Sequence, residues 1–143
     1  MELTSVALRG HAGASELLAY GMKGTPGRVL IVDDEPLVSG LLRDFLTTGG
    51  DEVAIAASGA DALKIVPVFQ PDVILTDMLM PGMSGTDLLD ALRRAGVIVP
   101  VILISGQPIT PEGFFGLLEK PFDLQKLAEV VTAAIDHGRT GRA

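Results

Sequence analysis

Five side chains that can bind a metal ion or handle a phosphoryl group stand directly after short apolar stretches of the sequence. They are three carboxylates, one hydroxyl and one ammonium: Asp33, Asp34, Asp77, Ser105 and Lys120. Carboxylates held close together repel one another unless a cation or a proton relieves them. Oxygen ligands without Cys or His suit Mg²⁺, and a carboxylate nucleophile can form an aspartyl phosphate. A lysine and the metal would neutralise the charge of the transferred group. The set therefore predicts phosphoryl transfer to a carboxylate.

Each of these residues also has a purely structural interpretation. Asp33 or Asp34 could cap a helix that begins near Pro36. Asp77 and Ser105 could belong to turns, and Lys120 could extend its ammonium from a sheet end into water. One acid suffices for a cap, however, so the second of two consecutive acids has no capping role. The joint occurrence of all five favours the functional interpretation.

The elements that would position these side chains alternate regularly along the chain. Apolar runs predict strands at 29–32, 52–57, 73–76, 99–104 and 117–118. Helical spacing predicts helices at 37–46, 58–66, 84–95 and 124–135, the first stopped by Gly49-Gly50 and the second capped by Ser58 and closed off by Pro67 and Pro71. Strands and helices in this alternation predict a doubly wound parallel α/β sheet with right-handed crossovers. Ligands bind such sheets at the carboxyl ends of the strands, which is where the five side chains stand.

Length and composition agree with this fold. The 143 residues predict one domain, and 48% hydrophobic residues with only 4% aromatics suit a parallel sheet buried on both faces. A net charge of −7 argues against nucleic acid as a partner. No apolar run could span a bilayer and no signal peptide is legible, so we expect no membrane contact. The absence of cysteine fits a reducing compartment, and we expect a cytoplasmic protein.

The chain divides into three parts. Residues 1–27 are predicted to form either a flexible leader or a short docked helix, with Ser15–Met22 as the helical stretch. Residues 28–136 form the folded body. Residues 137–143 are predicted to be a frayed tail.

Four motifs together resemble the receiver domain of two-component response regulators. They are Val29-Leu30-Ile31-Val32-Asp33-Asp34-Glu35-Pro36, the run from Pro71 to Gly85, Ile104-Ser105-Gly106 and Lys120-Pro121-Phe122. The resemblance covers about residues 28–136. It implies a five-stranded flavodoxin-like sheet with the strand order 2-1-3-4-5.

The resemblance also implies a role for each site residue. Asp77 corresponds to the phosphoacceptor, which receives its phosphoryl group from a histidine kinase or a phosphotransfer protein. Asp33 and Asp34 correspond to the acidic pair that holds Mg²⁺ together with Asp77 and the backbone carbonyl of Leu79. Ser105 corresponds to the switch hydroxyl.

Further positions follow from the same resemblance. Lys120 corresponds to the ammonium that pairs with the phosphoryl group, and the Lys120-Pro121 bond to one that is cis in the family. The backbone amides of Leu79 and Gly106 would complete the anion cradle. Gly85 corresponds to a glycine that opens the third helix, where a positive φ would be tolerated.

Two departures from the family pattern fall in one segment. Only 15 positions separate Ser105 from Lys120, and prolines and glycines interrupt them, so we expect a shortened or missing fourth helix. Leu117 stands where the family usually has Tyr or Phe. Of Phe114 and Phe115, we expect one to pack inward and the other to lie near the surface. Both departures lie on the surface that members of the family commonly use to dimerise or to bind their target. We therefore expect a mainly monomeric protein, whose downstream protein target is unknown.

Three other interpretations of these residues are less consistent with the sequence. A haloacid-dehalogenase-type hydrolase also uses Asp, Mg²⁺, Ser/Thr and Lys, but it carries the nucleophile on the first strand, opposite to the order here. A flavodoxin-like FMN binder needs a Ser/Thr-rich phosphate loop, where Asp33-Asp34 would repel the phosphate. A degenerate receiver acting only as an interaction module lacks support because all five site residues are present. We therefore predict a stand-alone receiver domain that signals by protein contact and is not an enzyme.

Overall fold

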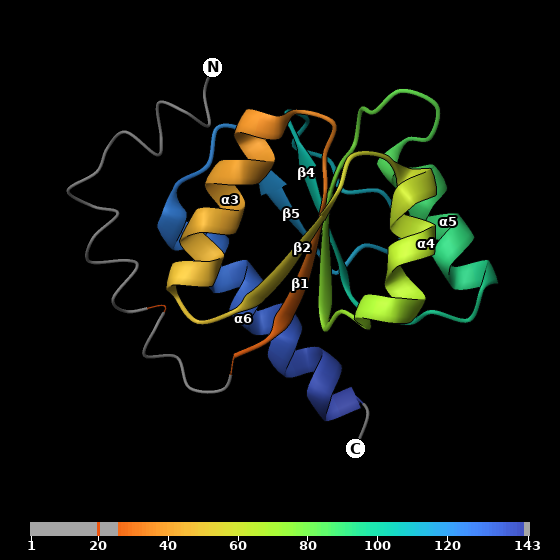
Figure 1. Ribbon diagram of the computed structural model, residues 1–143. Coiled ribbons are helices and arrows are strands. Elements are labelled where there is room, and N and C mark those ends of the chain that lie inside the picture. Colours follow the sequence, from red (N-terminus) through yellow and green to blue (C-terminus); the bar gives the residue numbers. More distant parts are fainter. Residues whose placement is uncertain (1–19, 21–25, 142–143) are drawn as a thin grey trace.

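Five parallel strands form one sheet between two layers of helices (Figure 1). The structure is a computed structural model that describes residue 20 and residues 26–141. Its elements in chain order are β1 (Arg28–Val32), α3 (Pro36–Thr48), β2 (Glu52–Ala56), α4 (Gly59–Phe69), β3 (Val73–Asp77), α5 (Gly85–Arg94), β4 (Val101–Ser105), β5 (Gly116–Glu119) and α6 (Leu124–Gly141). The strand order β2-β1-β3-β4-β5 confirms the predicted doubly wound sheet.

Local sequence signals set most helix boundaries. Helix α3 begins at Pro36 and ends before Gly49 and Gly50, the latter with a φ of 108°. The side chain of Ser58 accepts a hydrogen bond from the Asp61 amide and caps α4. Helix α5 begins with a capping box, in which the side chains of Ser84 and Asp87 each accept a hydrogen bond from the other residue's backbone N–H.

The sheet separates two hydrophobic cores. Helices α3 and α6 cover one face, and α4 and α5 cover the other (Figure 1). Successive residues of a strand point to opposite faces, so Ile31 lies in the α3–α6 core and its neighbour Leu30 in the α4–α5 core. Strands β3 and β4 are buried at every position, because both faces are covered.

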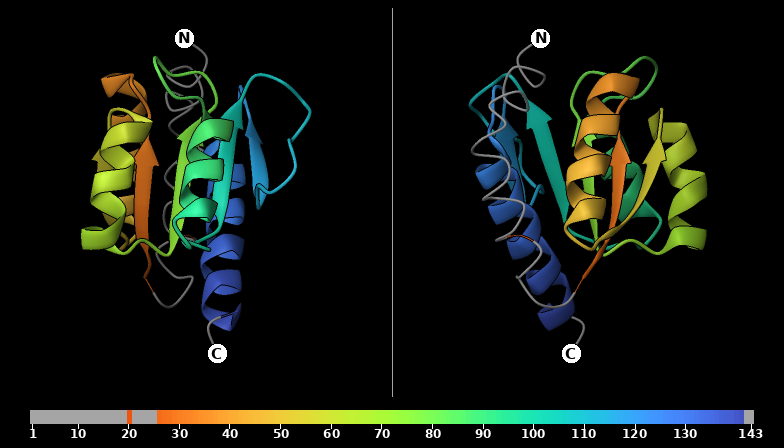
Figure 2. Two further views of the ribbon diagram at one scale, coloured as in Figure 1. Left: turned by 90° about the vertical axis from the view of Figure 1, so that its right-hand side faces the viewer. Right: turned by 60° about the vertical axis from the view of Figure 1, so that its left-hand side comes forward.

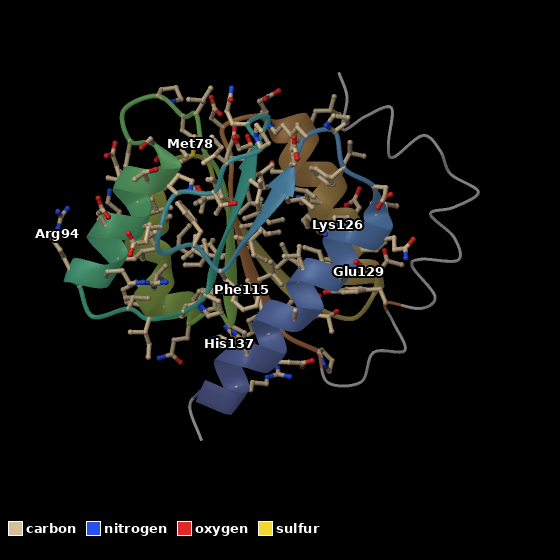
Figure 3. The ribbon with its side chains drawn as sticks, turned by 180° about the vertical axis from the view of Figure 1, so that it is seen from behind. Met78, Arg94, Phe115, Lys126, Glu129 and His137 are labelled. Atoms are coloured by element: carbon tan, nitrogen blue, oxygen red, sulfur yellow. The ribbon has the colours of Figure 1, made fainter. Side chains whose placement is uncertain are left out.

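The segment between β4 and β5 is an open loop (Figure 2). Its residues 106–115, all of them described, contain no helix, which agrees with the prediction of a shortened or missing fourth helix. The expectation that one phenylalanine packs inward and the other lies near the surface is wrong. Both are half-buried: Phe114 packs against the α4–α5 core and Phe115 against the α3–α6 core, since adjacent residues of an extended chain alternate in direction. The Phe115 ring centroid lies 5.2 Å from that of His137 on α6 (Figure 3).

Two predicted helix ends need correction. Helix α4 continues past Pro67 to Phe69, because a proline in the last turn removes only one backbone hydrogen bond. Helix α6 runs through the predicted tail to Gly141. Gly138 of α6 lies beside Pro100, where an added Cβ would come no closer than ordinary contact distance, and the guanidinium of Arg139 lies 3.6 Å from a carboxylate oxygen of Asp72.

Most of the predicted leader lies outside the described residues, as does all of Ser15–Met22 except Tyr20. Among the described helices, none has the length and apolar character needed to cross a bilayer.

Candidate functional site

The carboxyl edge of the sheet gathers the predicted site residues. Asp33 follows β1, Asp77 ends β3, Ser105 ends β4 and Lys120 follows β5. The parallel register pairs Asp77 with Ile104 and Ser105 with Glu119, so the last residues of neighbouring strands stand side by side. Figure 3 marks this edge with Met78, the residue after Asp77.

Three carboxylates meet at this edge. Asp33, Glu35 and Asp77 each offer an oxygen, and these oxygens all lie within 4.8 Å of one another. Asp33 is 2% exposed and Asp77 6%, whereas Glu35 is exposed. One oxygen of Asp33, Oδ1, accepts the backbone N–H of Glu35 at 2.9 Å. The other, Oδ2, is buried without a hydrogen-bond partner.

Burial makes the charge of Asp33 costly. Desolvation raises the pKa of the Asp33 carboxyl from 3.8 to about 6. The hydrogen bond from the Glu35 amide opposes this rise, and the nearby charge of Asp77 adds to it. A buried, unpartnered carboxylate oxygen beside two further carboxylates is a place that favours a bound cation.

A lysine partly compensates the negative charge. The ammonium of Lys120 lies 3.3 Å from Oδ1 of Asp77 and donates a hydrogen bond to it. The backbone N–H of Lys120 donates to the carbonyl of Ser105 at 2.8 Å, which ties the end of β5 to the end of β4. The Lys120-Pro121 peptide bond is cis, as the resemblance implies.

The backbone of Asp77 is held closely from two sides. The buried hydroxyl of Thr76 donates to the carbonyl oxygen of Asp77 at 3.0 Å. A Cβ added at Gly85 would lie 2.8 Å from the same oxygen. Gly85 has no positive φ, although a glycine would tolerate one, since the described glycines with positive φ are Gly50, Gly82, Gly96 and Gly113. The glycine is needed for close approach of α5 to the end of β3.

Exposure to solvent differs among the remaining site positions, which are Ser105, Gly106 and Leu79. Ser105 is 5% exposed, and its hydroxyl oxygen accepts the backbone N–H of Gln107 at 3.0 Å. Gly106 is exposed, and a Cβ there would meet nothing within 4 Å. The side chain of Leu79 is 80% exposed, at the second position after Asp77.

The second acid of the predicted pair is placed differently from the first. Asp34 is exposed and lies outside the three-carboxylate cluster, in which Glu35 takes part instead. Sequence reasoning missed Glu35, although its position directly after two acids was a signal. The N-cap of α3 is Glu35, and its side chain makes no capping hydrogen bond. Asp33 and Glu35 thus crowd the site, and the Glu35 side chain does not cap the helix.

Comparison with known proteins identifies the family. The family model described as "Response regulator receiver domain" matches residues 29–132. The chain belongs to this family. Receiver domains are signalling modules that interact with histidine kinases or phosphotransfer proteins, and they typically bind Mg²⁺ at an acidic pocket.

Individual receiver proteins support the assignment. The nitrate/nitrite response regulator protein NarP of Escherichia coli is 38% identical over 120 residues, which are 78% of this chain and 56% of that protein. The DNA-binding response regulator MtrA of Mycolicibacterium smegmatis is 32% identical over 115 residues, 76% of this chain and 50% of the relative. The chain thus spans about half the length of these relatives. The chemotaxis protein CheY4 of Vibrio cholerae superposes with a TM-score of 0.71 at 28% identity, over 77% of this chain and 99% of that structure.

Proposed function

We propose that Asp77 accepts a phosphoryl group from a histidine kinase or a phosphotransfer protein. The observation that carries the proposal is the placement of the Asp77 carboxylate, which is buried beside two further carboxylates and 3.3 Å from the Lys120 ammonium. In the proposed step an oxygen of Asp77 attacks phosphorus while the bond from phosphorus to the donor's nitrogen breaks. That nitrogen keeps the electron pair, and Asp77 becomes an acyl phosphate.

The acidic cluster fits Mg²⁺. Its donors are all oxygens, and Oδ2 of Asp33 is a buried acceptor that lacks a partner. Asp33, Asp34 and Asp77, with the backbone carbonyl of Leu79, are the proposed ligands. Bound there, Mg²⁺ would neutralise charge on the phosphoryl oxygens during transfer.

Glu35 lies in the carboxylate cluster and Asp34 lies outside it, so an experiment has to decide which of the two is the third carboxylate ligand of Mg²⁺. Thermal melts at rising Mg²⁺ concentration would compare Asp34→Asn with Glu35→Gln, because a ligand that binds only the folded state raises its stability. Loss of the Mg²⁺ effect in Asp34→Asn supports the proposed set. Loss in Glu35→Gln alone would assign the third carboxylate to Glu35.

The remaining site residues hold the phosphoryl group after transfer. Lys120 would pair with one of its oxygens, and the hydroxyl of Ser105 would donate to another. The backbone amides of Leu79 and Gly106 would complete the cradle. Ser105 is the last residue of β4 and directly precedes the loop that replaces the fourth helix. A new hydrogen bond donated by its hydroxyl would therefore act at the start of that loop.

The output of the domain is proposed to be contact with a protein. A net charge of −7 disfavours binding to nucleic acid by this domain, although MtrA is named a DNA-binding regulator. We also propose that the protein is mainly monomeric and cytoplasmic and is not an enzyme. The second candidate is a degenerate receiver that acts without phosphorylation.

Intact-protein mass spectrometry separates the two candidates. The chain is incubated with a small phosphodonor, with and without Mg²⁺, alongside Asp77→Asn and the matched control Asp90→Asn on the exposed side of α5. We expect gain of one phosphoryl group with Mg²⁺ in the unaltered protein and in Asp90→Asn, and none in Asp77→Asn. An unaltered protein that gains no phosphoryl group from any small donor would favour the degenerate module.

A further inference from the structure

Tyr20 is buried at the end of α3 opposite to the acidic site. Its side chain is 2% exposed and belongs to the α3–α6 core. The ring centroid lies 5.3 Å from that of Phe45, with an angle of 32° between the ring planes. Aromatic pairs at this separation contribute more to the stability of the fold than the burial of their apolar surface alone would give.

The hydroxyl of Tyr20 has a specific partner. It donates to Oδ2 of Asp51, a residue that is 5% exposed, while the backbone N–H of Gly27 donates to Oδ1 at 2.8 Å. The Asp51 carboxylate thereby joins Tyr20 to the residue before β1. A buried carboxylate needs such donors, because an unmet acceptor in the interior is costly. Burial and the Asp51 carboxylate also raise the pKa of the Tyr20 phenol well above its usual value.

Gly49 makes room for the ring. Its backbone has a φ of −78° and a ψ of −1°, so the conformation itself would accept any residue. A Cβ added at Gly49 would overlap the ring of Tyr20. The space that the missing side chain leaves is therefore filled by the aromatic ring.

We propose that the notch formed by Phe45, Gly49 and Asp51 is an intramolecular docking site whose occupant is Tyr20, so that the chain is anchored at Tyr20 to the C-terminal end of α3. The notch matches a phenol in both of its chemical parts. Phe45 and Gly49 accommodate the ring, and Asp51 accepts a hydrogen bond from the hydroxyl. A partner protein that binds this end of α3 has to displace the chain's own tyrosine.

The unaltered protein provides the first test, because Tyr20 is the single tyrosine and the chain has no tryptophan. Tyrosine fluorescence and phenolate absorbance therefore report on Tyr20 alone. We expect acrylamide to quench the fluorescence several-fold less in the native protein than in urea. We also expect the phenol to ionise only as the protein unfolds at high pH. Native quenching equal to that in urea, or reversible ionisation near pH 10 without unfolding, would overturn the proposal.

A double-mutant cycle provides the second test. Gly49→Ala should lower the melting temperature of the unaltered protein, because the new methyl group displaces the ring. In a Tyr20→Ala background the same change should cause no loss, since the space is then empty. An equal effect of Gly49→Ala in both backgrounds would contradict docking of Tyr20. Gly40→Ala, at a position on α3 where a Cβ would meet no atom closer than 3.8 Å, is the matched control and should act alike in both backgrounds.

Tyr20→Phe separates the ring from the hydroxyl. The variant keeps the aromatic ring in the notch and removes the donor to Asp51. We expect a smaller fall in melting temperature than for Tyr20→Ala. If Tyr20→Ala does not fold, the quenching and ionisation measurements on the unaltered protein still decide the matter, because they need no variant.

Discussion

Replacement of Asp33 by asparagine should stabilise the metal-free protein at neutral pH. The carboxyl of Asp33 is 2% exposed, its Oδ2 lacks a partner, and Asp77 and Glu35 crowd it. Asparagine removes the charge, keeps an oxygen to accept the Glu35 amide, and offers an N–H group to the neighbouring carboxylates. The substitution therefore removes the free-energy penalty of keeping this charge buried in the folded state.

The magnitude follows from the pKa of this carboxyl. A rise from 3.8 to about 6 corresponds to a penalty of about 3 kcal/mol once the group is ionised. Asparagine does not recover all of it, because its amide must find partners of its own, so we expect a gain of about 2 kcal/mol. For a chain of this size that gain is a rise of about 7 °C in the melting temperature.

The pH dependence gives this prediction its sign. A carboxyl whose pKa is raised in the folded state favours folding below its unfolded pKa, and that contribution is lost as the pH rises through the folded value of about 6. The advantage of Asp33→Asn should therefore be near zero at about pH 4 and complete above about pH 7.

The assay is a set of melts in chelator at several pH values, with exposed Asp34→Asn as the control that should change stability by less than about 0.5 kcal/mol. Excess Mg²⁺ should reverse the order, because it stabilises the unaltered protein more than Asp33→Asn. A variant less stable than the unaltered protein in chelator at neutral pH would refute the reasoning.

Three further predictions concern the site and its output. Lys120→Met leaves the buried Asp77 carboxylate without the ammonium that lies 3.3 Å away. Thermal melts in chelator should therefore show a loss of about 1 to 2 kcal/mol in the free energy of unfolding. An unchanged melt would mean that the pair contributes nothing to stability. Gly85→Ala places a methyl group 2.8 Å from the Asp77 carbonyl oxygen, so it should slow phosphorylation and lower the free energy of unfolding by about 2 kcal/mol. The control Gly40→Ala should leave stability unchanged or raise it. Equal effects of the two substitutions would contradict the close approach of α5 to β3. Phosphorylation should change amide exchange within 105–117, and unchanged protection there would rule out this loop as the route to a partner.

The sheet was predictable because its signals are local and mutually consistent. Runs such as Val29–Val32 are short, apolar and followed by polar residues, and strand boundaries fall within about two residues of the observed ones. The loss of the fourth helix was predictable for the same reason, since proline and glycine act on the backbone itself. The resemblance to receiver domains supplied the strand order, which no local signal contains.

The misses depend on tertiary contacts. Helix α6 extends to Gly141 because Arg139 and Gly138 pack under the amino ends of the strands, a contact that no periodicity reveals. Gly85 is required for an approach between α5 and β3, so its reason lies in packing rather than in its own φ. The place of Glu35 beside Asp33 likewise follows from the turn between β1 and α3, which spacing alone does not fix.

The most direct test of the central claim is the position of the phosphoryl group. Borohydride reduces an aspartyl phosphate to homoserine, so peptide mapping after reaction with a small phosphodonor locates the modified residue. We predict homoserine at position 77, formed only when Mg²⁺ is present. Homoserine at position 33 or 34, or a phosphoryl group that borohydride does not remove, would contradict Asp77 as the acceptor.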